Sequence, residues 1–295
     1  MKKFPDIRRW FDIVNYAEIN SCRKIEINMK DLSDTEIDEF CKEFALFICR
    51  LRCPSAKLLR EMEDAVNGSS VLNSGRKKIF QDIFYTGFIS DDKYKLTKDF
   101  KLSFDDDAVK GYFGECFYYI LREQIFEDEK VYIEPKFPKK SSKVPGIDFI
   151  DIRKDVDGYY MIIGEVKTTG NSYSTRLPEI IQAFQGRIDK NFSEIYQSIL
   201  ESDDESIPEY SAFLEEMLDI FYRLTGSGNK KKRVAGAINY DYQGKNAGKL
   251  AFRKVKEELE EIVDDFPACR RFKLIGIYNI EDVIERMRDR IWNVL

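Results

Sequence analysis

Apolar and polar residues alternate on both sides of a turn near the middle of this chain. The two apolar runs cover residues 146–152 and 159–168, and the turn-rich segment 153–158 with its Asp-Gly pair separates them. Alternation with a period of two on either side of such a turn is typical of a β-hairpin. The pattern therefore predicts two adjacent strands at the centre of the sequence.

Three charged residues interrupt this otherwise apolar hairpin. Side chains of a strand point alternately to its two faces, so Glu165 and Lys167 share one face while Val166 points to the other. Asp148 has apolar neighbours on both sides in the first strand. Burying such charges is unfavourable unless they are compensated, and a divalent metal held by Asp148 and Glu165 beside Lys167 would do so. The alternative is an edge hairpin with a solvated Glu and Lys, since acidic-x-Lys spacing recurs elsewhere in the chain.

The first hundred residues predict a smaller α+β module. Residues 23–29 alternate like a strand, and Ser33 with Glu36 forms a capping box that opens a helix. A second helix is expected over residues 55–66. We interpret residues 1–100 as a regulatory or partner-binding unit, and a plain scaffold role remains equally open.

Residues 101–295 are expected to form the main α/β domain, after a polar, charge-rich boundary. A helix with a broad apolar stripe is predicted over residues 108–126, followed by a strand over residues 130–136. Glu115 lies in this helix. The sequence leaves open whether Glu115 reaches the hairpin site or is a partly exposed helix residue.

The second half of the chain adds two polar features. A helix over residues 178–200 follows the hairpin, with Gln182 near its start. Gln182 is either a residue of a solvated helix face or one that faces the site or a nucleic acid. Directly before a strand over residues 234–240, a loop carries four consecutive cations, Lys230, Lys231, Lys232 and Arg233. These cations would either bind phosphates or form a solvated loop.

The composition limits the available chemistry. The chain of 295 residues is 43% hydrophobic and contains no histidine, which excludes Ser-His-Asp and Cys-His catalysis and histidine metal sites. Its net charge of −5 argues against binding to polyanions through bulk charge. No apolar run is long enough to span a membrane, so a cytoplasmic protein is expected. The six cysteines are expected to be free thiols, and their spacing fits no metal cluster.

The hairpin resembles the core motif of the PD-(D/E)XK nuclease superfamily. That motif is an Asp followed by (D/E)-x-K on adjacent strands, and it matches Pro145-Gly-Ile-Asp148 and Gly164-Glu165-Val166-Lys167. The proline lies three residues before the aspartate and not next to it. The resemblance implies an α/β, restriction-endonuclease-like fold with a mixed central sheet flanked by helices. It also implies a Mg²⁺- or Mn²⁺-dependent endo- or exodeoxyribonuclease.

The same resemblance implies roles for individual residues. Asp148, Glu165 and the Val166 carbonyl would bind the metal, and Lys167 would orient water or stabilise charge in the transition state. Glu115, from the helix before the hairpin, would hold a second ion or position water.

Within the superfamily, the chain is similar to the HamA nuclease of Hachiman anti-phage defence. The similarity rests on its length, the Gly-x-x-Gly-Glu helix and the C-terminal strand Ile275-Gly-Ile-Tyr-Asn. It implies DNA as the substrate and a helicase partner. Two alternatives stay open: a stand-alone restriction endonuclease, and a catalytically idle module that binds nucleic acid or protein.

Overall fold

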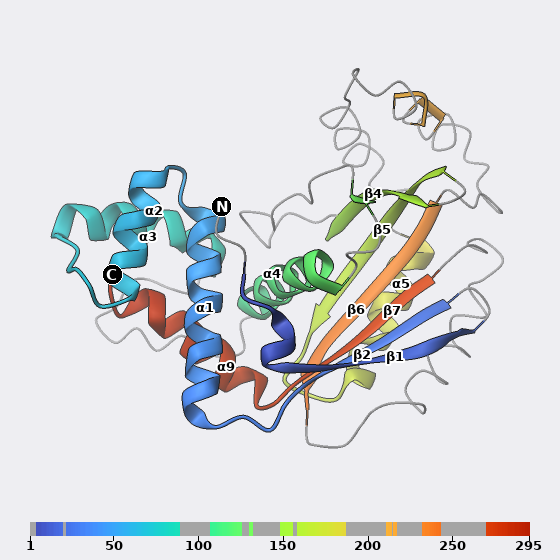
Figure 1. The fold of residues 1–295 in the computed structure, drawn as a ribbon, viewed down its shortest axis with the longest axis horizontal. Coiled ribbons are helices and arrows are strands. Elements are labelled where there is room, and N and C mark those ends of the chain that lie inside the picture. The colour runs from blue at the N-terminus through green and yellow to red at the C-terminus, as the bar shows by residue number, and fades with distance from the viewer. Residues whose placement is uncertain are drawn as a thin grey trace.

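In the part of the chain that the structure describes, seven strands form a mixed sheet at the centre of the molecule, with helices on both of its faces (Figure 1). The structure is a computed structural model. It describes residues 4–19, 22–88, 107–125, 130–131, 148–155, 158–186, 211–213, 215–216, 232–242 and 270–295.

The sheet is assembled from segments far apart in the sequence, in the order β1-β2-β7-β6-β5-β4-β3. The strands are β1 (Phe11–Ile19), β2 (Cys22–Met29), β3 (Lys130–Val131), β4 (Phe149–Asp155), β5 (Gly158–Thr168), β6 (Lys232–Asp241) and β7 (Arg270–Ile277). Strands β2, β7, β6 and β5 run parallel to one another, whereas β1 and β4 are antiparallel to their neighbours. The predicted mixed α/β class is confirmed, and the narrower restriction-endonuclease-like assignment stays a prediction.

The helices cover the sheet and extend it at one end. They are α1 (Asp34–Arg52), α2 (Ala56–Val66), α3 (Ser74–Phe88), α4 (Asp107–Ile125), α5 (Leu177–Gly186) and α9 (Ile280–Trp292), with short 3-10 turns η1 (Ile7–Arg9) and η2 (Tyr173–Thr175). Helix α4 lies on one face of the sheet, and α1, α2, α3 and α9 gather at the end where both termini lie (Figure 1). None of the helices in the described part of the chain is long and apolar enough to cross a membrane.

The predicted hairpin is confirmed. Strands β4 and β5 pair antiparallel from Phe149 opposite Gly164 to Asp155 opposite Gly158, so the connection between them is two residues long. Two-residue connections are the commonest in β-hairpins. The expected strand at 130–136 is described only as Lys130–Val131, which pairs with β4 at the edge of the sheet.

The capping box is also confirmed. The Ser33 side chain accepts a hydrogen bond from the Glu36 amide, and the Glu36 carboxylate accepts one from the Ser33 amide at 2.8 Å. Helix α1 begins directly afterwards and ends before Pro54, as the sequence indicates. The expected helix over residues 55–66 and the expected strand over 234–240 are present as α2 and β6.

Strand β1 is the main element that sequence patterning did not predict. It pairs antiparallel with β2, and β2 pairs parallel with β7 near the opposite end of the chain. The first thirty residues therefore contribute two strands to the same sheet that contains the hairpin. The predicted boundary at residue 100 lies outside the described residues, and whether residues 1–100 fold by themselves stays a prediction.

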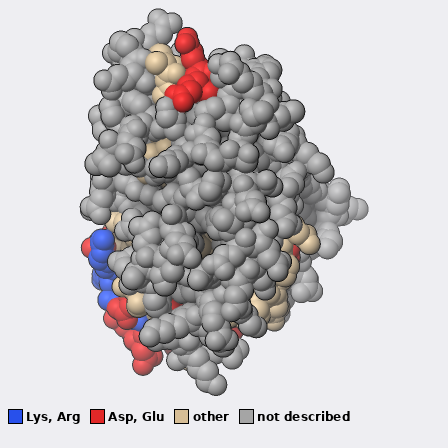
Figure 2. All heavy atoms as spheres, turned by 90° about the vertical axis from the view of Figure 1, so that its right-hand side faces the viewer, with Lys and Arg blue, Asp and Glu red and all other residues tan. Residues whose placement is uncertain are grey.

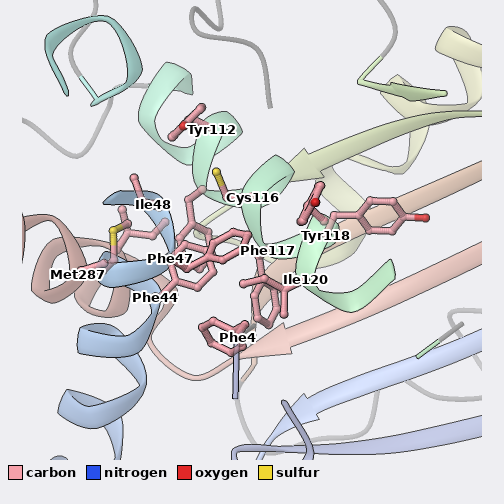
Figure 3. Close-up of a cluster of buried hydrophobic side chains, with 14 of the residues drawn as sticks. Phe4, Phe44, Phe47, Ile48, Tyr112, Cys116, Phe117, Tyr118, Ile120 and Met287 are labelled. Atoms are coloured by element: carbon pink, nitrogen blue, oxygen red, sulfur yellow. The ribbon is translucent and has the colours of Figure 1, made fainter. Parts of the chain in front are cut away.

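The hydrophobic core is rich in aromatic side chains and continues from the first residues to the last. Phe44 of α1 lies against Phe113 and Phe117 of α4, with ring centroids 4.9 and 5.9 Å away (Figure 3). Phe40 of the same helix also contacts Phe117 edge-on at 5.9 Å. Such contacts add to the stabilisation that burial of the rings provides. The helix that carries Glu115 is thereby attached to the N-terminal helices.

We expect Phe117→Ala to lower the free energy of unfolding by about 3–5 kcal/mol, because it removes a fully buried ring from a close-packed core. Urea denaturation of the purified chain measures this change. Val71→Ala is the control, since Val71 is 92% exposed and its truncation should change stability by less than about 0.5 kcal/mol. A Phe117 variant as stable as the Val71 variant would contradict the packing described here.

Candidate functional site

Glu165 and Lys167 point to the same face of the sheet, as the alternation in the sequence predicts. Helix α5 covers this face, because its Ile180 lies against Gly236, the neighbour of Glu165 in β6. Glu165 is accordingly only 4% exposed. Its Oε1 atom lies 2.5 Å from Lys167 Nζ, so the ammonium neutralises the buried carboxylate. The edge-hairpin alternative fails on this point, because β5 is flanked by β4 and β6 and its glutamate is buried.

Asp148 lies at the point where the hairpin opens. Regular pairing of β4 with β5 begins at Phe149, one residue later. The Asp148 carboxylate instead reaches the backbone of β5, where its Oδ2 accepts a hydrogen bond of 2.6 Å from the Val166 amide. Because Val166 separates Glu165 from Lys167, the structure brings the three predicted hairpin residues to one short stretch of β5.

The same contact shows where the Val166 carbonyl points. In an extended strand, the N–H and C=O of one residue point to the same side, toward the same neighbouring strand. Since the Val166 N–H points to Asp148, its carbonyl points to that side too. Strand β4 begins only beyond this position, so the regular pairing described between β4 and β5 leaves this carbonyl out.

Glu115 lies on α4, which covers the face of the sheet opposite to that of Glu165 and Lys167. It lines a small pocket together with Asp148, Val166, Phe149, Tyr118, Tyr119 and Arg122. Glu115 and Asp148 are both partly exposed, whereas Val166 is buried. Glu115 thus lies beside Asp148 and is also a partly exposed helix residue, so its role at the site stays a prediction.

A glycine explains how α4 comes so close to the hairpin. A Cβ atom on Gly114 would collide with Thr168 Oγ1 of β5 and would lie 2.8 Å from Asn239 Nδ2 of β6. The Asn239 amide also donates to Thr168 Oγ1 at 3.2 Å, which fixes these two side chains beneath the helix. The absence of a side chain at residue 114 therefore sets the depth at which the neighbouring Glu115 sits.

A group of four contacting residues that begins with Phe149, next to Asp148, was not identified from the sequence. The ring of Phe149 contacts the ring of Tyr118, with centroids 4.6 Å apart, and the Arg122 guanidinium lies 5.1 Å from the Phe149 centroid. Lys273 of β7 is 2% exposed and donates a hydrogen bond to the Tyr118 hydroxyl. An aromatic–cation stack thus surrounds the start of β4. Tyr118 and Arg122 lie three and seven residues after Glu115, a helical spacing that could have indicated their shared face.

The structure does not bring the remaining candidates together with Asp148, Glu165 and Lys167. Gln182 is exposed on α5. Lys230 and Lys231 lie outside the described residues. Lys232 and Arg233, which were expected in a flexible loop, instead begin β6 and pair with Met161 and Ile162, because the strand starts two residues earlier than its apolar pattern suggests.

Figure 2 shows the face of the molecule that lies on the right-hand side of Figure 1. Where its residues are described, Lys and Arg side chains lie beside Asp and Glu side chains at the lower edge. The described portion of this face therefore carries both positive and negative side chains. The whole chain has a small excess of acidic residues.

The described cysteines belong to the core or lie close to it. Cys41, Cys49 and Cys116 are buried, Cys53 is half-buried, and all four are free thiols. Burial raises the pKa of Cys41 to about 12 and that of Cys53 to about 12, so both thiols stay protonated near neutral pH. A protonated, buried thiol is a poor metal ligand and a poor nucleophile.

The donor set fits a hard divalent cation such as Mg²⁺. This ion commonly uses one or two carboxylates and keeps several waters, and so does not require a cage of acids. Among the described residues, no group of three or more His, Cys, Asp or Glu side chains is arranged to hold a metal. Asp148, which accepts a hydrogen bond from the Val166 amide, and Glu165 would provide the two carboxylates. In this structure the Lys167 ammonium balances the charge of Glu165.

The fold and site together describe a mixed α/β protein with an Asp, Glu and Lys constellation on a central hairpin. A family model, HamA, matches residues 6–291, and the chain therefore belongs to the HamA family, a component of the Hachiman anti-phage defence system. A search of curated proteins found no match to the chain. The match begins before β1 and ends inside α9, so it includes the N-terminal strands and helices as well as the hairpin.

We expect Gly114→Ala to destabilise the protein by about 1–3 kcal/mol, because the added methyl group would force α4 away from Thr168 and Asn239. Gly111→Ala is the matched control in the same helix. No atom lies within 4 Å of a Cβ added at residue 111, so this variant should gain about 0.5–1 kcal/mol from reduced backbone entropy. Urea denaturation compares the two, and equal stability would contradict close approach at Gly114.

Proposed function

We propose that this HamA family member is a metal-dependent deoxyribonuclease and the nucleic-acid-cleaving component of its defence system. The observation that carries the proposal is the position of the Asp148 carboxylate on the Val166 amide, between Glu165 and Lys167. Two carboxylates and one ammonium on a short piece of sheet are the groups that metal-assisted hydrolysis of a phosphodiester needs.

Each residue would have a distinct part in this chemistry. Asp148, Glu165 and the Val166 carbonyl would hold the metal, which when bound supplies an activated water and polarises the phosphate. The Val166 amide fixes the orientation of the Asp148 carboxylate before any substrate arrives. Fixing a catalytic group in advance avoids reorganisation during the reaction.

Lys167 would stabilise the negative charge that develops on the phosphate oxygens. Its side chain is 21% exposed, whereas that of Glu165 is 5% exposed, so the ammonium is the more accessible member of the pair. A donor aimed at developing charge in a partly desolvated site is worth more than one in water. Glu115 would position a water or a second ion from the α4 side of the pocket.

A helicase partner is part of this proposal. HamA belongs to a multi-component defence system, and the chain carries a net charge of −5. An acidic protein has little nonspecific attraction for DNA, so delivery of the substrate by a DNA-translocating partner would supply what bulk charge does not.

We expect Mg²⁺-dependent cleavage of DNA by the wild type to be lost in Asp148→Asn, Glu165→Gln and Lys167→Ala. Each variant should lower the rate by about 10²-fold or more, as removal of a positioned charged group commonly does. The assay follows plasmid and linear DNA, with RNA in parallel, for the chain alone and for the chain with its copurified helicase. Discrete fragments would favour a restriction endonuclease over a general nuclease.

Glu61→Gln is the control for this experiment. Glu61 forms an ion pair of 2.8 Å with Arg76 in the helices at the far end of the molecule from the hairpin (Figure 1). This variant should cleave at the wild-type rate. Unchanged cleavage by Glu165→Gln, or no cleavage by wild type with helicase and metal present, would show that the proposal is wrong.

A further inference from the structure

The pocket on the α4 side of the hairpin contains a positive charge as well as two acids. Its described lining includes the carboxylates of Glu115 and Asp148 and the guanidinium of Arg122. Arg122 lies seven residues after Glu115 on α4, so the two side chains emerge from the same face of the helix two turns apart. The pocket thus combines groups that bind cations with one that binds anions.

Arg122 is deeply buried for an arginine. The residue is only 4% exposed, and its guanidinium lies against the Phe149 ring, next in sequence to Asp148. Placing a cation in such a position is unfavourable compared with an apolar side chain of similar length, which could pack on Phe149 equally well. This charge lies beside the proposed reaction site, where a negatively charged substrate would approach.

We propose that Arg122 binds a non-bridging oxygen of a phosphodiester phosphate in the nucleic-acid strand at this site. A guanidinium presents several N–H donors in a flat fork that matches phosphate oxygens, and it stacks on aromatic rings while doing so. Phe149 provides that ring, and Tyr118, held by Lys273, packs against Phe149. This inference rests on the proposed nuclease function and names the group that recognises its substrate.

The position of the pocket agrees with this role. Asp148 belongs both to the pocket lining and to the hairpin contact with Val166, so the pocket adjoins the residues proposed to hold the metal. Glu115 and Asp148 are the partly exposed members, whereas Arg122 lies at the buried end. The competing explanation is that Arg122 only balances these two acids and supports Phe149, without touching substrate.

The salt dependence of DNA binding separates the two explanations. One lost phosphate contact lowers the slope of log affinity against log salt concentration by about 0.7–0.9. For Arg122→Gln we therefore expect about tenfold weaker binding of a short DNA without added divalent metal, together with that smaller slope. Arg122→Lys keeps the charge and should retain the wild-type slope.

Arg50→Gln is the matched control. Arg50 of α1 is another buried arginine, and its Nε atom lies 2.8 Å from Oε1 of Glu63 on α2. Its replacement should lower thermal stability and leave the slope unchanged. All measurements use the full chain, alone and with its copurified helicase.

The outcomes decide the inference in either direction. An unchanged slope in Arg122→Gln, with normal binding by the wild type, would overturn the role of Arg122 while the nuclease proposal stands. If Arg122→Gln does not fold, Arg122→Lys decides: about tenfold slower single-turnover cleavage with unchanged thermal stability supports a fork-shaped phosphate contact, and wild-type cleavage overturns it. A wild type that neither binds nor cuts DNA, with or without helicase, would overturn both proposals.

Discussion

The contact between the Asp148 carboxylate and the Val166 amide is the constraint on which the site depends. It joins Asp148, directly before β4, to the C-terminal part of β5, at the point where regular pairing between these strands has not yet begun. With it, the carboxylate lies beside the only residue that separates Glu165 from Lys167.

The packing around the hairpin serves this contact from both faces. On one face, Ile180 of α5 covers Gly236 next to Glu165 and thereby limits the access of water to the Glu165–Lys167 ion pair. On the other face, Gly114 lets α4 approach β5 and β6 closely enough for Glu115 to share a pocket with Asp148. Burial on both faces strengthens the electrostatic interactions between these groups.

The N-terminal segment takes part in the same architecture. Strands β1 and β2 extend the sheet beyond β7, and α1 contacts both α4 and the C-terminal helix α9. Arg286 of α9 bridges Asp34 and Asp38 of α1 at 3.2 Å, so charged groups add to the aromatic contacts between the chain ends. The family match also includes these segments at both ends of the chain.

The sequence by itself determined the local elements and the identity of the main charged residues. Alternation around a turn predicted the hairpin, the capping box predicted the start of α1, and the Asp, Glu and Lys of the hairpin stood out because apolar residues surround them. These signals are local, since they depend on residues within one strand or one helical turn. The HamA resemblance, which rested on the chain length, the Gly-x-x-Gly-Glu helix and the C-terminal strand, is confirmed by the family match.

Only the tertiary structure decided how distant segments meet. No local pattern could show that β2 pairs with β7, near the other end of the chain, or that Lys273 reaches Tyr118. The same is true of Arg122 and Phe149, whose contact depends on the crossing of α4 over the hairpin. The physical reason is that contacts between elements depend on side-chain packing across the whole core, and a periodic pattern records only which face of each element is apolar.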